Sequence, residues 1–158
     1  MKKITPFLWF DNQALEAARL YVSIFKNSKI HGSEKFENSG PNENETVQVV
    51  SFELDGQQFQ AMNAGPLFKF NEAISFTVDC KDQAEVDYYW NSLIADGGEE
   101  SQCGWLKDKF GLSWQIIPEQ LTRLMSDPDP VKSQRVMHAM LHMKKIDIAK
   151  LQESYNAG

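Results

Sequence analysis

The sequence predicts an α+β fold in which two βαβββ modules form a cup of curved sheets, followed by a C-terminal helical extension. The first observation is a repeated pattern: an apolar strand leads into an amphipathic helix near residue 10 and again near residue 80. The second is the strand pair that ends each module, closed around Asp55-Gly56 and around residues 108–111. A unit used twice in this way predicts pseudo-symmetry, with two sheets enclosing one hollow.

We expect one domain over residues 1–118, with module 1 at about 1–66 and module 2 at about 67–118, and the extension over 119–158. A chain of 158 residues, 42% of them hydrophobic, suits one compact domain or two small modules that share a core. The formal net charge of −6 argues against nucleic acid as the main partner. Because no apolar run is long enough to cross a bilayer and no signal peptide is recognisable, we expect a cytoplasmic protein without a membrane partner.

The elements of module 1 follow from alternation, helical spacing and turn signals. Asp11 and Asn12 offer capping oxygens to the first helix. Val50, Phe52 and Leu54 alternate with more polar residues, which predicts a strand with one buried face. Asp55-Gly56 predicts a type I′ or II′ turn that closes the last hairpin of the module. The expected elements are a strand at 3–10, a helix at 14–25, and strands at 30–36, 46–54 and 57–62.

Module 2 and the extension show clear helix boundaries. Asp82 and Glu85 form a capping box, and Asp129-Pro130 and Asp147 mark two later helix starts. The longest helix of the extension carries a broad apolar arc, so we expect it to dock on its own sheet or on a partner subunit. The expected elements are a strand at 73–78, a helix at 83–94, strands at 102–107 and 112–117, and helices at 118–125, at 131–144 and from 148 onward.

Two glutamines and several aromatic residues are candidates for ligand contacts. Gln60 and Gln115 each lie in the last strand of a module, so pseudo-symmetry would place them across the cup from one another. A buried glutamine must find hydrogen-bond partners, and therefore belongs either to a core network or to a ligand site. The aromatic residues Trp9, Phe70 and Trp105 similarly either line a pocket or fill the core.

Histidine and cysteine offer two further kinds of chemistry. His138 and His142 are four residues apart, a spacing that can chelate a metal, but no acidic residue stands between them and an exposed helix face is the simpler explanation. Cys103 is expected in a strand near Lys107, and a nearby cation would make its thiol nucleophilic. No histidine in the cup strands could serve as its base, so a packed thiol is the alternative. We expect Cys80 to be structural and both thiols to be free.

Several segments resemble the PhnB-like branch of the vicinal oxygen chelate superfamily, which includes glyoxalase I, bleomycin-resistance proteins and extradiol dioxygenases. They are residues 7–25, 59–66, 68–71 and, above all, 103–118, and the tail from 134 to 148 resembles the usual extension of the branch. The likeness implies paired βαβββ modules assembled as a homodimer. The branch is often labelled a 3-demethylubiquinone-9 3-methyltransferase domain, but the sequence has no glycine-rich turn for S-adenosylmethionine.

Catalytic members of the superfamily hold a divalent metal with His, Glu or Gln from the first and last strands of each module. None of the corresponding positions is a histidine or a carboxylate, and neutral oxygens alone bind Zn²⁺ or Fe²⁺ poorly. We therefore expect no metal and no other cofactor. The corresponding positions are Pro6 or Leu8, Gln60 or Met62, Ala73 or Ser75, and Gln115.

We expect the cup to bind a small, partly aromatic or polar organic molecule, with a homodimer completing each pocket. One alternative is a lyase or transferase-type enzyme that uses Cys103 or a recruited divalent metal. Another is an interaction module whose cup is filled by its own side chains. The expected ligand contacts are the polar Gln60, Asn63, Ser75 and Gln115 and the apolar Trp9, Met62, Phe70, Trp105 and Trp114.

Overall fold

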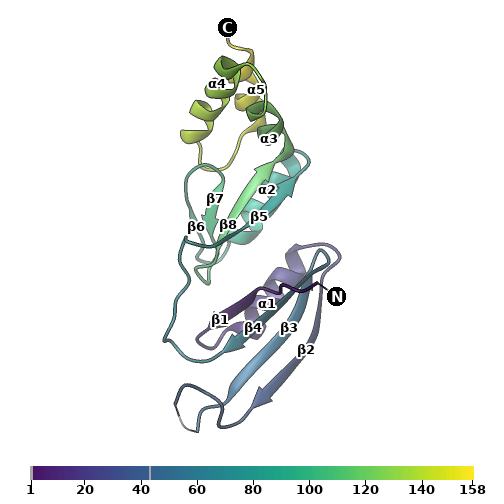
Figure 1. Ribbon diagram of the computed structural model, residues 1–158, viewed down its shortest axis with the longest axis vertical. Helices are drawn as coiled ribbons and strands as arrows, with labels where there is room; N and C mark the ends of the chain where they lie inside the picture. Colours follow the sequence, from purple (N-terminus) through teal and green to yellow (C-terminus); the bar gives the residue numbers. More distant parts are fainter. Residues whose placement is uncertain (1, 43) are drawn as a thin grey trace. The chain divides into compact units, whose positions relative to one another are not determined.

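The computed structural model describes residues 2–42 and 44–158 (Figure 1). The chain divides into two compact units, Met1–Phe70 and Asn71–Gly158. Both units begin with the order βαβββ, so the predicted α+β class and the predicted repeat are confirmed. The domain boundary at residue 118 and the shared cup stay predictions.

Unit 1 is a mixed four-stranded sheet with the strand order β1-β4-β3-β2. β1 runs parallel to β4, and the other neighbouring strands are antiparallel. The first strand is shorter than predicted because it begins only after Pro6. The elements of unit 1 are β1 (Phe7–Phe10), α1 (Ala14–Ile24), β2 (Lys29–Phe36), β3 (Val47–Leu54) and β4 (Gln57–Asn63).

The core of unit 1 lies between α1 and one face of the sheet. The predicted alternation is confirmed, since Val50, Phe52 and Leu54 are buried and the residues between them are only half-buried. Phe52 stacks on Phe59 with ring centroids 5.3 Å apart and lies 6.4 Å from the ring of Tyr21 on α1. Side chains one position away in each strand must therefore point to the other side, called here the helix-free face of unit 1.

Unit 2 repeats this plan with the strand order β5-β8-β7-β6 and continues into three helices. β5 pairs with β8 in parallel, which matches the pairing of β1 with β4. The elements of unit 2 are β5 (Ser75–Cys80), α2 (Gln83–Ile94), β6 (Glu99–Glu100), β7 (Trp105–Lys107), β8 (Ser113–Pro118), α3 (Glu119–Met125), α4 (Pro130–Leu141) and α5 (Ile148–Asn156).

The strand predicted at 102–107 is wrong in its first half. Residues 102–104 form a turn in which Cys103 and Gly104 have φ values of 59° and 83°. Left-handed residues cannot continue a strand, so β7 starts only at Trp105. The edge strand β6, which pairs with β7, has no counterpart in the predicted elements.

The last three helices pack on one another around a small apolar core of their own, formed by Leu121, Leu124, Val136, Ile146 and Leu151. The predicted caps are present, because Asp129 accepts a hydrogen bond from the Val131 N–H (2.9 Å) and Asp147 accepts one from the Lys150 N–H (3.1 Å). None of the described helices is long and apolar enough to pass through a bilayer.

The helix predicted at 131–144 ends at Leu141, and among the described residues it packs mainly on other helices and not, as one prediction had it, on its sheet. α4 packs instead on α3 and α5. Its predicted apolar arc is split, because Val136 is fully buried while Met137 and Leu141 are 44% and 54% exposed. Docking on a partner subunit stays a prediction.

Candidate functional site

The helix-free face of unit 1 carries three of the predicted ligand contacts. Trp9 on β1 lies opposite Met62 on β4, and Gln60 lies opposite Phe7. Each of these positions alternates with a buried residue that faces α1, so Trp9, Gln60 and Met62 share the other face. The Trp9 indole donates a hydrogen bond to the Gly65 carbonyl oxygen (2.9 Å), which fixes the orientation of its ring.

Gln60 borders a depression of about 390 Å³ on this face. Its side chain is half-buried and makes no hydrogen bond to another residue in the described ranges, so its amide group is available to a bound molecule. Only Gln60 among the lining residues was predicted. The alternation in β3 could have revealed two more, Val49 and Ser51. The depression is lined by His31, Gly32, Glu34, Phe36, Val49, Ser51 and Gln60.

Asn63 and Phe70 lie elsewhere. The Asn63 carboxamide oxygen accepts a hydrogen bond from the Ala14 N–H (2.7 Å), and its amide nitrogen donates to the Gln48 side-chain oxygen (3.2 Å). Asn63 thereby holds the start of α1 and points to the helix-covered side. The Phe70 ring meets the buried Phe10 edge to face, with centroids 5.1 Å apart. Both contacts are structural ones that the sequence did not indicate.

In unit 2, α2 packs on β5, β7 and β8. The side of this sheet that points away from α2, called here the helix-free face of unit 2, brings together Ser75, Gln115 and Trp105. The Gln115 amide donates a hydrogen bond to the Ser75 hydroxyl oxygen (2.9 Å), and Trp105 lies directly opposite Gln115 in the antiparallel pair of β7 and β8. Lys107 lies opposite Ser113 in the same pair, on the same face. Ser113 was not among the predicted ligand contacts. Its place follows from its spacing of two residues from Gln115.

Trp114 belongs to the core of unit 2 and does not line the helix-free face. It is 3% exposed, and its indole donates to a carboxylate oxygen of Asp108 (2.9 Å). The other oxygen of Asp108 accepts hydrogen bonds from the N–H groups of Phe110 (2.9 Å) and Leu112 (3.1 Å). Since Asp108 is itself 2% exposed, this carboxylate is the buried centre of the turn between β7 and β8.

The two cysteines have different surroundings. Cys80 is fully buried, and burial raises the pKa of its thiol to about 12, assisted by the negative charges of Glu85, Asp79 and Asp82. Cys103 is half-buried in the turn before β7, and both thiols are free as expected. The predicted strand location of Cys103 is therefore wrong, and its role as a nucleophile stays a prediction.

His138 on α4 and His142, the residue that follows the helix, lie close together on an exposed surface. Their ring centroids are 4.8 Å apart, and one ring nitrogen of His142 lies 2.8 Å from the carbonyl oxygen of His138. Within residues 2–42 and 44–158, no three His, Cys, Asp or Glu side chains are grouped closely enough to hold a metal ion.

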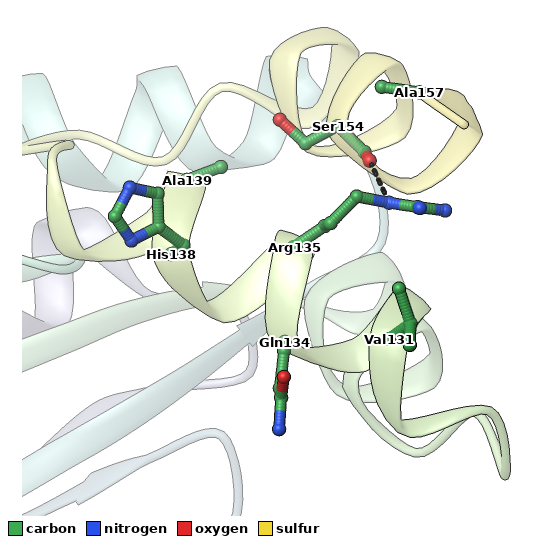
Figure 2. Close-up of a pocket in the computed structure, with 7 residues that line it drawn as sticks. All are labelled: Val131, Gln134, Arg135, His138, Ala139, Ser154 and Ala157. Atoms are coloured by element: carbon green, nitrogen blue, oxygen red, sulfur yellow. Dashed lines mark hydrogen bonds between the residues drawn. The ribbon is translucent and has the colours of Figure 1, made fainter.

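A second hollow, of about 500 Å³, lies between α4 and α5 (Figure 2). Arg135 dominates one side of it, but its guanidinium donates to the carbonyl oxygens of Ser154 (3.0 Å) and Tyr155 (2.9 Å) at the end of α5. These bonds fasten α5 to α4, so the arginine has a structural task. The hollow is lined by Val131, Gln134, Arg135, His138, Ala139, Ser154 and Ala157.

The family positions for a divalent metal are not suited to one here. Gln60 and Gln115 occupy equivalent places, each on the helix-free face of the last strand of its sheet. Leu8 points to the buried side, and the Ser75 hydroxyl is engaged by Gln115. The donors present are neutral amides and a hydroxyl, whereas Zn²⁺ and Fe²⁺ need imidazole, thiolate or carboxylate. These residues do not fit the metal of the superfamily.

Comparisons with known proteins agree with this fold. The family model of 3-demethylubiquinone-9 3-methyltransferase matches residues 2–117, so α3 to α5 lie beyond the match. A PhnB protein from Bacillus cereus, described as a putative 3-demethylubiquinone-9 3-methyltransferase, is 32% identical, with a TM-score of 0.64 over 74% of this chain and 99% of that one.

More distant structures share the fold alone. A protein from Pseudomonas aeruginosa is 18% identical, with a TM-score of 0.61 over 75% of this chain and 98% of that one. The fosfomycin resistance protein FosX from Listeria monocytogenes is 17% identical, with a TM-score of 0.53 over 77% and 94%. A search of the curated proteins returned no match. Together with the repeated βαβββ order, these matches show that the chain belongs to the 3-demethylubiquinone-9 3-methyltransferase family, the PhnB-like branch of the glyoxalase and bleomycin-resistance fold.

Proposed function

We propose that the protein binds a small organic molecule on the helix-free faces of its sheets and does so without a divalent metal. The observation that carries this proposal is the Gln60 side chain, which is half-buried at the edge of a depression and has no hydrogen-bond partner among the described residues. A partly desolvated amide without a partner costs free energy, and a ligand that bonds to it recovers that free energy.

The surroundings of Gln60 have the composition of a ligand pocket. Such pockets combine apolar walls with a few placed polar groups and enclose roughly 300–1,000 Å³. Phe36 and Val49 provide the apolar part of this depression, and Ser51 provides a hydroxyl next to Gln60, its partner in the strand pair. Trp9 and Met62 extend the apolar surface on the same face.

Unit 2 offers an equivalent surface around Gln115. Its amide nitrogen is engaged by Ser75, which leaves the amide oxygen as an acceptor, and Trp105 beside it provides an aromatic ring. We propose Ser75, Trp105 and Gln115 as ligand contacts.

We also propose that the protein works as the homodimer that the family resemblance implies. Light scattering coupled to size-exclusion chromatography tests the homodimer directly.

The proposal is tested by screening small aromatic and polar molecules for a rise in melting temperature and a change in tryptophan fluorescence. Molecules that bind the wild type are expected to bind Gln60→Ala with lower affinity. Their affinity for Gln152→Ala, a control at an exposed position of α5, should equal that for the wild type. Ligand binding raises the melting temperature by mass action, so a panel without a single stabilising molecule contradicts the proposal.

The second candidate function is an enzyme that recruits a divalent metal. It is favoured by one observation, the shared fold of FosX from Listeria monocytogenes, which has been solved in complex with Mn(II). The neutral donors described above argue against it. Metal content of the untagged protein, measured by mass spectrometry, separates the two candidates, because a stoichiometric transition metal would favour the enzyme.

A further inference from the structure

The helix-free face of unit 2 carries a compact group of polar side chains next to an indole ring, called here the β7–β8 cluster. It consists of Trp105 and Lys107 on β7, Ser113 and Gln115 on β8, and Ser75 on β5. Lys107 pairs with Ser113, and Trp105 pairs with Gln115. Because directly opposed residues bring their side chains within about 5 Å of one another, the five residues form one surface.

Ser113 is the most unusual member of the cluster. It is 1% exposed, and its hydroxyl oxygen is buried without a hydrogen-bond partner. Buried hydroxyl groups nearly always have a partner, and a missing one costs free energy. The neighbouring Ser75 hydroxyl accepts a bond from Gln115, whereas no side chain or backbone group of the described residues bonds to the Ser113 hydroxyl.

Lys107 supplies the cluster with a positive charge that a ligand can reach. Its ammonium group forms an ion pair with Glu72, whose hydrogen bond raises the pKa of Lys107, and the two side chains are 35% and 60% exposed. Exposed ion pairs contribute little to stability because water screens them. A ligand anion can therefore replace Glu72 beside Lys107 at small cost.

Most of the hydrogen-bonding groups of the cluster that are still unused are donors. The Trp105 indole N–H has no hydrogen bond to another residue of the described chain, and the ammonium of Lys107 and the hydroxyl of Ser113 add two more donor groups. Gln115 contributes one acceptor, its amide oxygen. A surface of donors around a cation matches an oxyanion, and an indole ring matches a flat apolar body.

We infer that the β7–β8 cluster binds the negatively charged group of a small organic anion, a carboxylate or a phosphonate, while Trp105 contacts the flat part of the molecule. This inference rests on the proposed function, to which it adds the chemical class of the ligand. The oxyanion lies against Lys107 and Ser113, and Glu72 competes with it.

Benzoate, phenylphosphonate and the neutral benzamide are suitable probes, because they share a ring and differ in charge. Their binding can be followed by NMR through the side-chain signals of Trp105 and Gln115, with the indole signal assigned from Trp105→Phe. Benzoate or phenylphosphonate is expected to shift both signals with an affinity about tenfold above that of benzamide. The anion that binds with the higher affinity identifies whether the site prefers a carboxylate or a phosphonate.

Substitutions at the ion pair should change the affinity in opposite directions. Lys107→Met is expected to weaken binding of the preferred anion about tenfold, whereas Glu72→Gln, which removes the competing carboxylate, is expected to strengthen it about two- to threefold. Lys81→Met is the matched control, because it removes the same charge from another exposed ion pair, with Glu85. Ser113→Ala should also lower the affinity for the preferred anion and leave the affinity for benzamide unchanged.

The outcomes separate this inference from the proposed function. If benzamide binds as tightly as both anions, or if Lys107→Met leaves the affinity for the anions unchanged, the inference is overturned while small-molecule binding stands. If the wider panel finds ligands at Gln60 but no probe of any charge shifts the signals of Trp105 and Gln115, the β7–β8 cluster is not a binding site. If no molecule binds to the protein at either face, the inference and the proposed function are both refuted.

Discussion

The side-chain oxygen of Asn63, at the end of β4, accepts a hydrogen bond of 2.7 Å from the backbone N–H of Ala14, the first residue of α1. Gln13, which occupies the N-cap position, makes no such bond with its own side chain, and Asp11 and Asn12 do not provide the predicted cap. A residue 49 positions away thus does what the N-cap residue of a helix usually does. The bond ties the helix to the sheet that it covers.

Replacing this cap should destabilise unit 1. Asn63→Ala is expected to lower the free energy of unfolding by about 1 kcal/mol, because the Ala14 N–H loses its acceptor. Asn63→Asp, which keeps an acceptor oxygen, should cost less. Urea denaturation measures both, with Asn71→Ala as the control in an exposed loop. Equal costs for Asn63→Ala and Asn71→Ala would show that the cap is unimportant.

The buried carboxylate of Asp108 should be coupled to Trp114. In Asp108→Asn, the amide group that replaces one oxygen faces the indole N–H, so two donors meet. We expect a loss of about 2–3 kcal/mol in the free energy of unfolding. The same substitution in a Trp114→Phe background should cost clearly less, because the opposing donor is gone. A double-mutant cycle measures the coupling, and strictly additive costs would refute it.

Gly104 should tolerate no side chain, for two separable reasons. Its φ is 83°, and an added Cβ would lie 3.0 Å from the Ile116 carbonyl oxygen and 3.1 Å from Ile146. Gly111 has a similar φ of 86° but open space around it. We expect Gly111→Ala to cost about 1 kcal/mol from backbone strain alone, and Gly104→Ala at least about 2 kcal/mol. If chemical denaturation gives similar losses of unfolding free energy for Gly104→Ala and Gly111→Ala, Ile146 and the backbone must move to make room for the methyl group.

The two thiols should respond differently to pH and to reagents. Native protein should react with a thiol-specific reagent at Cys103 only, and Cys80 should react after denaturation. Because the pKa of Cys80 is raised to about 12 in the folded state, the unfolded chain loses this proton first as the pH rises. The stabilising effect of the protonated thiol is therefore complete below about pH 9 and declines as the pH rises towards about 12.

Comparing the wild type with Cys80→Ala isolates this titration. The stability of wild type should fall more steeply above about pH 9 than that of the variant. Parallel pH profiles would show that the thiol does not titrate differently in the folded state.

Much of the fold was readable because strand alternation and helix caps are local signals. The paired modules, the buried face of β3 and the caps Asp129 and Asp147 all follow from residues close together in the chain. The same alternation correctly placed Gln60 and Gln115 in equivalent strands. The open depression could not be predicted in full, because four of its seven lining residues come from β2, an exposed edge strand with no apolar alternation.

Two site predictions conflicted with a rule that the sequence itself supplies. Neighbouring residues of a strand point to opposite faces, so Trp114 cannot share the helix-free face with Gln115, nor Asn63 with Met62. By contrast, the turn at Cys103 could not be foreseen, because its partners are the carbonyl oxygens of Met143 and Lys144, far away in the chain.

The backbone bonds from Cys103 to Met143 (2.7 Å) and from Gly104 to Lys144 (2.8 Å) also set an order of events during synthesis. When residues 103 and 104 are added to the growing chain, the residues whose carbonyl oxygens will hold their turn have not yet been joined to it. A nascent chain stopped just before residue 143 would therefore carry the sheet of the second unit with this corner still facing water. Completion of this turn waits for a segment that is translated some forty residues later.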